Sequence, residues 1–240
     1  DYSAAAWRVT ASLATGQTTA DGDEGADVLS GIENLTGSAY SDTLTGDDGA
    51  NVLRGGGGTD QLNGGDGVDT ADYSGAASGV TANLSTGQTT NDGDSANDVL
   101  TSIENLTGSA QDDVLTGDDG ENFLRGGGGD DLITAGLGDD IIDGGDGHDI
   151  LIVSDLASGY RLLQDGDDFI LKGPDGGDRL SGIESIRFSD GRVLELNRMY
   201  GLDADVWTSA DGRIPEALLS DDGALADKAG GGPEVMPGAD

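Results

Sequence analysis

The chain has 240 residues, of which 44 are glycine and 4% are aromatic, and its formal net charge is −36. Nucleic-acid binding by counterion release needs a basic patch, which a chain this acidic does not offer. A transmembrane helix needs about 20 consecutive apolar residues, and the sequence has no such run. The chain contains no cysteine, which excludes disulfides and thiolate metal sites, whereas its many carboxylates favour hard cations that prefer oxygen ligands.

Two copies of one long unit follow each other from the first residue. Asp1-Tyr2-Ser3 recurs as Asp72-Tyr73-Ser74, and the stretch 32–38 recurs with the same offset at 103–109. Residues 1–71 and 72–142 are therefore two copies, and repetition at a fixed period predicts a solenoid. The chain starts without Met or a signal-peptide pattern, so we expect it to be a piece of a longer protein.

Each copy opens with a spacer, residues 1–36 and 73–107, that carries short runs of alternating apolar and polar residues, such as 9–13 and 80–84. Alternation of this kind predicts strands. Because the length of one copy is close to that of four coils of two nonapeptides each, we expect the spacers to continue the solenoid as coils without the full motif. An outlying hairpin is the alternative.

The spacers also contain two Asp-Gly-Asp sequences, at 21–23 and 92–94, which resemble the start of an EF-hand loop. The later glycine and glutamate of that loop are missing, so a helix-loop-helix site is not expected. A solvated turn is the preferred interpretation, and an extra Ca²⁺ site is the alternative. The Ile-Glu pairs at 32–33, 103–104 and 183–184 are interpreted as strand residues rather than ligands.

A nonapeptide repeat follows each spacer, in blocks 37–72 and 108–152. The turns begin at Gly37, Gly46, Gly55 and Gly64 in the first block and at Gly108, Gly117, Gly126, Ala135 and Gly144 in the second. Positions 1, 2 and 4 favour glycine, which allows a sharp turn, and position 8 is a large aliphatic residue in eight of nine repeats. Two repeats make one coil, and stacked coils bury a thin aliphatic column between parallel strands.

The sixth position is Asp or Asn in all nine repeats. Turns on one edge lie two repeats apart along the chain, so their carboxylates and glycine carbonyls converge in an oxygen-only cage suited to Ca²⁺. The candidate side-chain ligands are Asp42, Asn51, Asp60, Asp69, Asp113, Asn122, Asp131, Asp140 and Asp149. The candidate glycines are Gly46, Gly49, Gly55, Gly56, Gly58, Gly64, Gly65, Gly67, Gly117, Gly120, Gly126, Gly127, Gly129, Gly136, Gly138, Gly144, Gly145 and Gly147.

Complete cages need two turns on the same edge, which predicts five complete sites and partial sites at the block ends. The predicted pairs of turns start at 37 with 55, 46 with 64, 108 with 126, 117 with 135, and 126 with 144. Tyr40 and Gln111 replace the fourth-position glycine in the opening turn of each block, and Asn51 and Asn122 lack a charge. The opening turns are therefore expected to be the weakest sites.

The chain changes character after the second block. In residues 153–196, apolar runs at 160–163 and 169–171 flank Asp165-Gly166, which predicts a hairpin, and 180–186 echoes 29–35. We expect this segment to cap the solenoid, because an open end exposes strand edges. In the tail, residues 197–240, a short helix is predicted over 214–225, and Gly230 to Pro233 is expected to be flexible.

The nonapeptide pattern G-G-x-G-x-D-x-U-x resembles the RTX (hemolysin-type) calcium-binding repeat family, with its best matches at 126–134 and 144–152. The resemblance implies an all-β fold, a right-handed parallel β-roll solenoid with a C-terminal β cap, that is disordered without Ca²⁺. It also implies export through the type I secretion apparatus of a Gram-negative bacterium, with the tail as the candidate signal. The expected location is extracellular or on the cell surface.

These features predict a calcium-binding module that folds on about five or more Ca²⁺ ions after secretion and is not an enzyme. One alternative is a carbohydrate-binding or stabilising module of a secreted protease, lipase or polysaccharide epimerase whose catalytic domain lies upstream. Another is part of a surface adhesin or surface-layer protein, and both leave open a contact with a polysaccharide or a cell surface. His148 occupies a variable turn position, so catalysis by it is not expected. Arg54 and Arg125 are interpreted as surface charges that offset nearby Asp residues.

Overall fold

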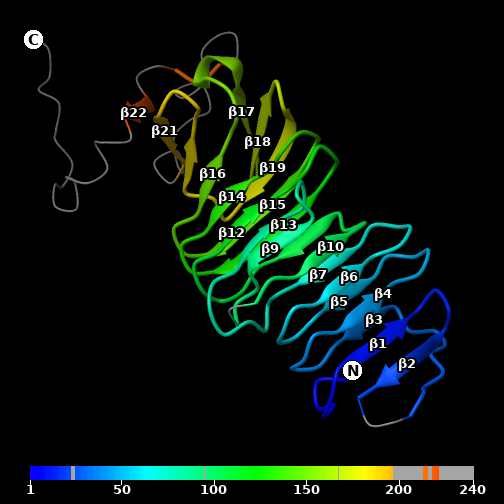
Figure 1. The fold of residues 1–240 in the computed structure, drawn as a ribbon. Coiled ribbons are helices and arrows are strands. Elements are labelled where there is room, and N and C mark those ends of the chain that lie inside the picture. Colours follow the sequence, from blue (N-terminus) through cyan, green and yellow to red (C-terminus); the bar gives the residue numbers. More distant parts are fainter. Residues whose placement is uncertain (23–24, 95, 167, 197–212, 216–217, 222–240) are drawn as a thin grey trace, which may run out of the picture.

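The computed structural model describes residues 1–22, 25–94, 96–166, 168–196, 213–215 and 218–221. In this part of the chain, strands from two sheets stack along one elongated solenoid (Figure 1). The only regular helical element described is a short 3-10 turn, η1 (Ala157–Gly159), so the fold is all-β as predicted. No helix among the described residues is long and apolar enough to cross a membrane.

Within the described residues, the two sheets contain 13 and 9 strands. In spatial order the first sheet contains β2 (Gln17–Asp21), β1 (Val9–Ser12), β4 (Thr43–Thr45), β6 (Gln61–Asn63), β10 (Val99–Thr101), β9 (Gln88–Asn91), β8 (Thr81–Asn83), β12 (Val114–Thr116), β14 (Leu132–Thr134), β16 (Ile150–Ile152), β20 (Ser185–Arg187), β21 (Arg192–Glu195) and β22 (Leu219–Asp221). The second contains β17 (Arg161–Asp165), β18 (Asp168–Gly173), β19 (Gly176–Ser181), β15 (Ile141–Asp146), β13 (Phe123–Gly128), β11 (Asn105–Thr107), β7 (Thr70–Asp72), β5 (Val52–Arg54) and β3 (Asn34–Thr36).

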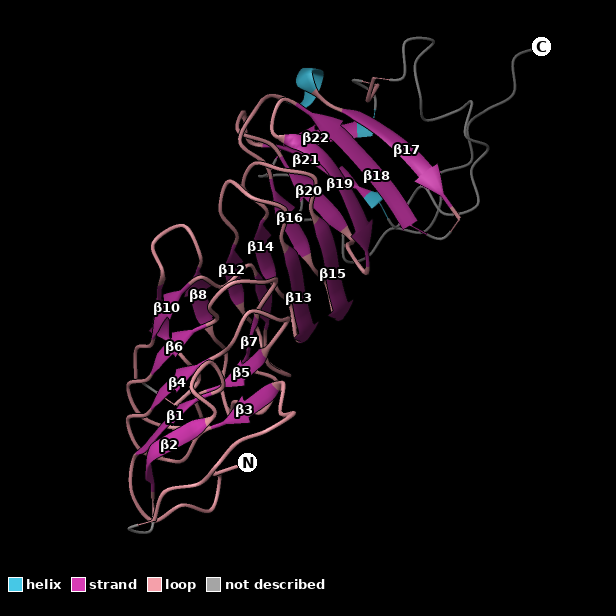
Figure 2. Cartoon of the chain, turned by 90° about the vertical axis from the view of Figure 1, so that its right-hand side faces the viewer, coloured by secondary structure: helices cyan, strands magenta, loops and turns pink. Residues whose placement is uncertain are grey.

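Within each nonapeptide block, consecutive strands alternate between the two sheets, and each strand pairs in parallel with the strand two positions later in the chain. Strand β4 pairs with β6, and β12 pairs with β14 in the same register, with Leu115 opposite Ile133. This offset of two nonapeptides is the coil predicted from the sequence. The parallel β-roll is confirmed, and Figure 2 shows its two stacks of short strands side by side.

The core is the predicted aliphatic column. All nine eighth-position side chains are at most 1% exposed. They are Leu44, Leu53, Leu62, Ala71, Leu115, Leu124, Ile133, Ile142 and Leu151. Each fully buried Leu or Ile contributes about 1.5–3 kcal/mol, but each three-residue strand supplies only one such side chain. The column alone is therefore a modest source of stability for a chain of this charge.

The spacer of the second copy combines the two predicted arrangements. Its strands β8, β10 and β11 pair in parallel with β12, β6 and β7, so they continue the solenoid. Strand β9 runs antiparallel between β8 and β10, so the hairpin is inserted within the sheet and does not lie outside the roll. The first copy repeats this arrangement, since β1 pairs in parallel with β4 and antiparallel with β2.

The two copies meet where the second spacer stacks on the first nonapeptide block. At this junction Ile103 is 6% exposed, whereas Ile32, its equivalent in the first copy, is 42% exposed. Strand β3, which follows Ile32, lies at the end of its sheet. The same spacer sequence is therefore buried in one copy and open in the other, because only the second copy has a nonapeptide coil beneath it.

The segment after the second block extends both sheets beyond the nonapeptides. Strands β19 and β20 pair in parallel with β15 and β16, so 180–186 forms part of a last coil, whose turns keep Gly176 and Gly182 at positive φ without the full nonapeptide motif. Strands β17 and β18 form the predicted hairpin around Gly166. Larger side chains fill this end, where the rings of Tyr160 and Phe188 lie 5.6 Å apart.

The helix predicted over 214–225 is wrong where the structure describes it. Residues 219–221 form strand β22, which pairs antiparallel with β21 and places Leu219 opposite Leu194. Pairing covers an edge of β21 that a helix would leave exposed, and this gain outweighs the local helix preference. The rest of the tail, including the expected flexible stretch 230–233, lies outside the described residues apart from 213–215 and 218.

Candidate metal centres between the turns

The turns use glycine where neighbouring turns come too close for a side chain. A Cβ atom on Gly126 would clash with Oδ2 of Asp131 and with the carbonyl oxygen of Gly144 in the next coil. Gly127 has a φ of 115°, and a Cβ atom there would clash with the carbonyl oxygen of Ser109 in the preceding coil. Backbone carbonyl oxygens therefore face the adjacent turn at close range.

The other predicted glycines occupy corresponding places. The first-position residues lie against the sixth-position side chain of their own turn, namely Gly46, Gly55, Gly64, Gly117 and Gly144. Positive φ angles occur at Gly56, Gly58, Gly65, Gly67, Gly129, Gly136, Gly138, Gly145 and Gly147. Gly49 and Gly120 differ, because their turns are closed by hydrogen bonds of 2.9 and 2.8 Å from their N–H groups to the carboxylates of Asp47 and Asp118.

The sixth-position side chains are buried and form hydrogen-bonded ladders along the two edges of the roll. The backbone N–H of Asp113 donates to Oδ1 of Asp131, and that of Asp131 donates to Oδ1 of Asp149, both at 2.8 Å. The same bond joins Asp42 to Asp60, Asn51 to Asp69, and Asn122 to Asp140. All five predicted pairs of turns are therefore brought together by this contact.

Five of these carboxylates keep one oxygen that no donor satisfies. Among the described residues, Oδ2 is buried and accepts no hydrogen bond in Asp60, Asp69, Asp131, Asp140 and Asp149. A buried charged oxygen without a partner is costly, and a cation between the turns would remove that cost. These buried oxygens without a donor are the observation that suits the turn carboxylates to binding a metal ion.

Burial also shifts the pKa values of these turn carboxylates. Burial, followed by the charges of neighbouring carboxylates, raises the pKa of Asp60 to about 8 and that of Asp131 to about 7. Burial likewise raises the pKa of Asp140 and Asp149 to about 6, with acidic neighbours adding to it. Each of these groups therefore favours either a proton or a nearby positive charge over remaining as an isolated anion.

The carboxylates of the two opening turns are satisfied by the protein itself. Ser38 donates both its backbone N–H and its hydroxyl to the carboxylate of Asp42, whose Oδ1 also accepts the N–H of Val9 at 2.6 Å. Ser109 and Val80 do the same for Asp113. This supports the expectation that the opening turns are the weakest sites.

The two Asn side chains are also fully engaged. Oδ1 of Asn51 accepts the N–H of Asp47 at 2.7 Å, and its amide nitrogen donates to the carbonyl of Glu33 at 2.9 Å. Asn122 repeats this pattern. In the described residues no three His, Cys, Asp or Glu side chains gather into a metal-binding group. Each cage would therefore rely on one or two carboxylates together with backbone carbonyls.

Glu104 and Glu184 continue the ladders, and their interpretation as strand residues was wrong. The carboxylate of Glu104 accepts the N–H of Asp69, and that of Glu184 accepts the N–H of Asp149, both at 2.8 Å. Each glutamate precedes its strand and stands two positions before a buried aliphatic residue, as the sixth-position Asp does. This spacing before a buried aliphatic residue is the sequence feature that could have identified both glutamates, although the turn glycines are missing.

Asp98 and Asp178 are two further ladder residues that were not predicted, because their turns lack the full glycine pattern of the nonapeptide. Both are buried and accept the N–H of a nonapeptide Asp, Asp98 from Asp60 at 2.8 Å and Asp178 from Asp140 at 3.2 Å. Asp98 is the sixth residue of a degenerate nonapeptide that begins at Gly93 and has Leu100 at its eighth position. The two edges therefore contain more stacked carboxylates than the nine repeats alone supply.

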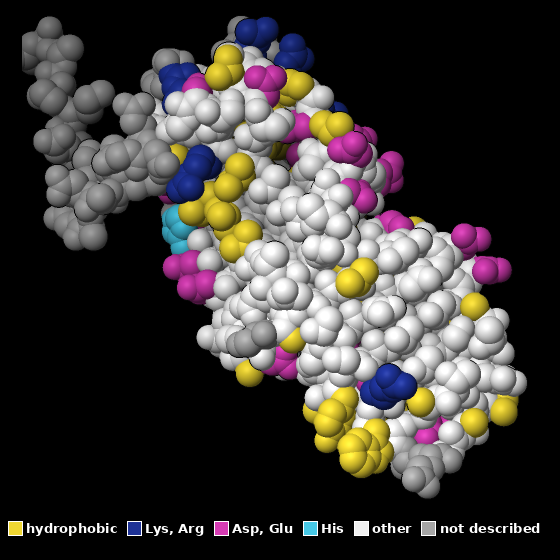
Figure 3. All heavy atoms as spheres, in the orientation of Figure 1, with side chains coloured by type: hydrophobic (Ala, Val, Ile, Leu, Met, Phe, Trp, Pro, Cys, Tyr) yellow, Lys and Arg dark blue, Asp and Glu magenta, His cyan; other side chains and the backbone are white. Residues whose placement is uncertain are grey.

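His148, Arg54 and Arg125 lie outside the ladders. His148 is exposed, and its backbone N–H donates to Asp130 at 2.9 Å. Arg54 forms an ion pair with Asp72, and Arg125 lies 3.4 Å from Asp143, which agrees with the interpretation of both as charges that offset Asp. Figure 3 shows acidic side chains along the rims of the roll, where the turns lie.

The raised pKa values predict how the metal-free protein responds to pH. A carboxyl group whose pKa is higher in the folded state than its ordinary value of 3.8 favours folding when protonated. That contribution is complete below about pH 3.8 and is lost as pH rises through 6 to 8, where Asp60, Asp131, Asp140 and Asp149 ionise. Circular dichroism of metal-stripped protein should show β structure decreasing from pH 4 to pH 8. A constant or increasing signal would contradict this.

Comparison with known families points to the same segments. A family model for the RTX calcium-binding nonapeptide repeat (4 copies) matches residues 36–71, 92–132 and 116–151. The matched segments contain all nine predicted sixth-position residues and also the degenerate turn that begins at Gly93. A search of curated proteins found no match.

Proposed function

Because this chain carries RTX calcium-binding repeats, we propose that it is a module of a secreted protein that folds as its stacked turns bind Ca²⁺. The buried, unsatisfied Oδ2 atoms of five turn carboxylates are the observation that supports it most strongly. Without a cation, the folded state must bury these anions within a chain of net charge −36. With a cation, binding free energy becomes folding free energy.

The hydrogen-bonded ladders between sixth-position side chains indicate which residues could bind each ion. Between the turns at 126 and 144, for example, Asp131 and Asp149 each offer a carboxylate, and the turn glycines offer carbonyl oxygens. Ca²⁺ accepts six to eight oxygen ligands in flexible geometry, whereas Mg²⁺ demands a tight octahedron. A cage made of backbone carbonyls and one or two carboxylates suits the larger ion.

Counting bound ions tests this function. We expect isothermal titration with Ca²⁺ to give at least five ions per chain, one for each same-edge pair of nonapeptide turns, and Mg²⁺ to bind far more weakly. The five pairs of sixth-position residues are 42 with 60, 51 with 69, 113 with 131, 122 with 140, and 131 with 149. A total of one or two ions would contradict the stacked cages.

The same chemistry supports export before folding. Cytosolic Ca²⁺ is too low to fill such sites, whereas millimolar Ca²⁺ outside the cell fills them, so the chain would pass through a type I apparatus unfolded and fold on the far side. We propose the tail, residues 197–240, as the export signal, and residues 153–196 as the cap of the roll. The module is then a binding and folding element without catalytic activity of its own.

Co-expression with a type I secretion apparatus tests export. The full chain should reach the medium, and a chain that ends at residue 196 should remain in the cell. Both proteins should bind the same number of Ca²⁺ ions after purification, because the nonapeptide blocks are untouched. Equal export of the two chains would refute the assignment of the signal.

A further inference from the structure

The hairpin turn between β9 and β10 contains a buried carboxylate that the nonapeptide cages do not use. Asp92 is 2% exposed, and its Oδ1 accepts the N–H groups of Asp94 and Ala96 at 3.1 and 3.0 Å. Its Oδ2 is buried and accepts no hydrogen bond from any described residue. The expected solvated turn is therefore wrong for Asp92, which the first copy covers.

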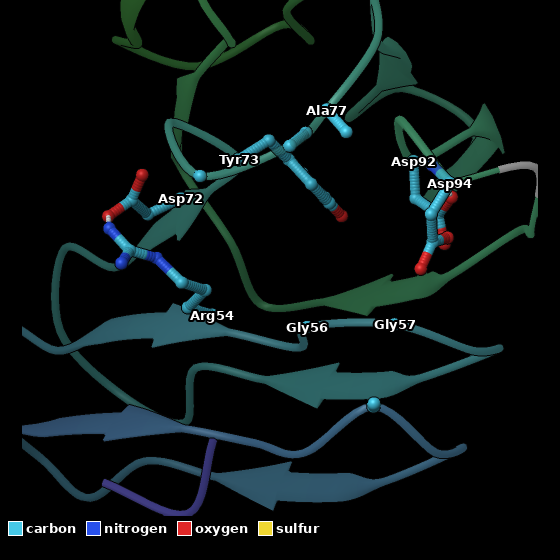
Figure 4. A pocket seen from close by; sticks show the side chains of 11 residues that line it. Arg54, Gly56, Gly57, Asp72, Tyr73, Ala77, Asp92 and Asp94 are labelled. Atoms are coloured by element: carbon cyan, nitrogen blue, oxygen red, sulfur yellow. Dashed lines mark hydrogen bonds and ion pairs between the residues drawn. The ribbon is translucent and has the colours of Figure 1, made fainter. Parts of the chain in front are cut away.

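A second carboxylate lies beside it. Asp94 accepts the N–H of Gly58 in the first copy, and a Cβ atom on Gly57 would meet Oδ2 of Asp94 at 2.6 Å. Burial, followed by contact with the carboxylate of Asp92, raises the pKa of Asp94 to about 6. Figure 4 shows the two side chains next to each other above Gly57. Two carboxylates in contact require a shared proton or a cation between them.

The surroundings leave room for an ion. Asp92 and Asp94 line a cavity of about 340 Å³ together with Tyr73, Gly56 and Gly57, so its walls come from both copies. Within it Arg54 is already paired with Asp72 and is not available to neutralise the two carboxylates. The hydroxyl of Tyr73 donates to Asp98 at 3.1 Å, which directs it to a different carboxylate.

We propose that Asp92 and Asp94 form an additional Ca²⁺ site that joins the two copies of the repeat at the turn of Gly57. The site differs from the nonapeptide cages because its carboxylates come from an inserted hairpin and not from sixth positions. An ion there would neutralise the orphaned oxygen of Asp92 and hold the second spacer onto the first block. It would therefore couple the folding of one block to that of the other.

The first copy provides a matched control. Asp21 is the equivalent of Asp92 in that copy, and its Oδ1 accepts the N–H of Gly25 at 3.0 Å. Its hairpin strand β2 lies at the end of its sheet, whereas β9 lies between β8 and β10 above the first block. Among the described residues, no nonapeptide coil stacks on the outer side of β2, so we do not expect Asp21 to complete a site of this kind.

The experiment counts Ca²⁺ ions on the full chain by native mass spectrometry for the parent protein and for Asp92→Asn, Asp94→Asn and Asp21→Asn. Asn at position 92 keeps the oxygen that closes the hairpin, and Asp94 is exposed, so both variants should retain the fold, which circular dichroism in Ca²⁺ checks. We expect Asp92→Asn and Asp94→Asn each to bind one ion fewer than the parent, and Asp21→Asn to bind as many.

Unchanged counts in Asp92→Asn and Asp94→Asn would overturn the proposal, and so would an equal loss in Asp21→Asn. The site rests on the same calcium chemistry as the proposed function, but the two fail differently. A parent protein that binds no Ca²⁺ refutes both, whereas a parent that binds five ions with no loss in the Asp92 and Asp94 variants refutes only the hairpin site.

Discussion

Asp131→Ala is expected to raise the Ca²⁺ concentration needed for half-folding clearly more than Asp42→Ala does. The turn of Asp131 is shared by two predicted cages, because Asp131 is bonded to Asp113 on one side and to Asp149 on the other. Its Oδ2 has no donor among the described residues, so its loss removes an oxygen for which a cation is the natural partner. At a Ca²⁺ concentration 100 times Kd, each site stabilises the fold by about 2.7 kcal/mol, so weakening two sites costs up to about 5 kcal/mol.

Asp42→Ala is the matched control. The carboxylate of Asp42 is held by Ser38 and Val9, so its removal leaves buried donors unpaired at a cost of about 1–3 kcal/mol but removes little metal affinity. The Ca²⁺ midpoint followed by circular dichroism, together with the ion count, separates the two effects. Asp131→Ala should lower the count and Asp42→Ala should not. Equal midpoints and equal counts would mean that these turns do not share ions.

The nonapeptide blocks could be predicted in detail because their period is strict. Each aliphatic eighth position implied a strand, and each sixth position implied a stacked side chain, as Leu124 and Asp131 show. This worked because adjacent coils repeat the same sequence, so local pattern and tertiary neighbour carry the same information. The five pairs of turns followed from stepping two nonapeptides at a time along the chain.

The rest depended on tertiary contacts that the strict nonapeptide pattern does not encode. Glu104 occupies a ladder position without turn glycines, and Asp98 occupies one in a degenerate nonapeptide that begins at Gly93. In both cases the neighbouring coil supplies the N–H group that the carboxylate accepts. Asp92 and Asp94 face the turn of Gly56 and Gly57 in the first copy, a contact between the two copies that the Asp-Gly-Asp sequence alone does not reveal. Strand β22 forms because β21 offers an edge, which the sequence of 214–225 does not reveal.

Dependence of the fold on Ca²⁺ is the largest effect that we expect. At neutral pH the metal-free chain has a net charge of −36 and a column of single aliphatic side chains as its core in the blocks. Folding would bury at least five carboxylate oxygens without a partner, so the balance favours the unfolded chain. Millimolar Ca²⁺ reverses this balance because its binding is coupled to the stacking of the turns.

Far-UV circular dichroism of the chain at pH 7.5, first in excess chelator and then in millimolar Ca²⁺ or Mg²⁺, tests this account most directly. We predict the spectrum of an unfolded chain in chelator, a cooperative gain of β structure with Ca²⁺, and little change with the same concentration of Mg²⁺. A stable β spectrum in excess chelator would contradict the account.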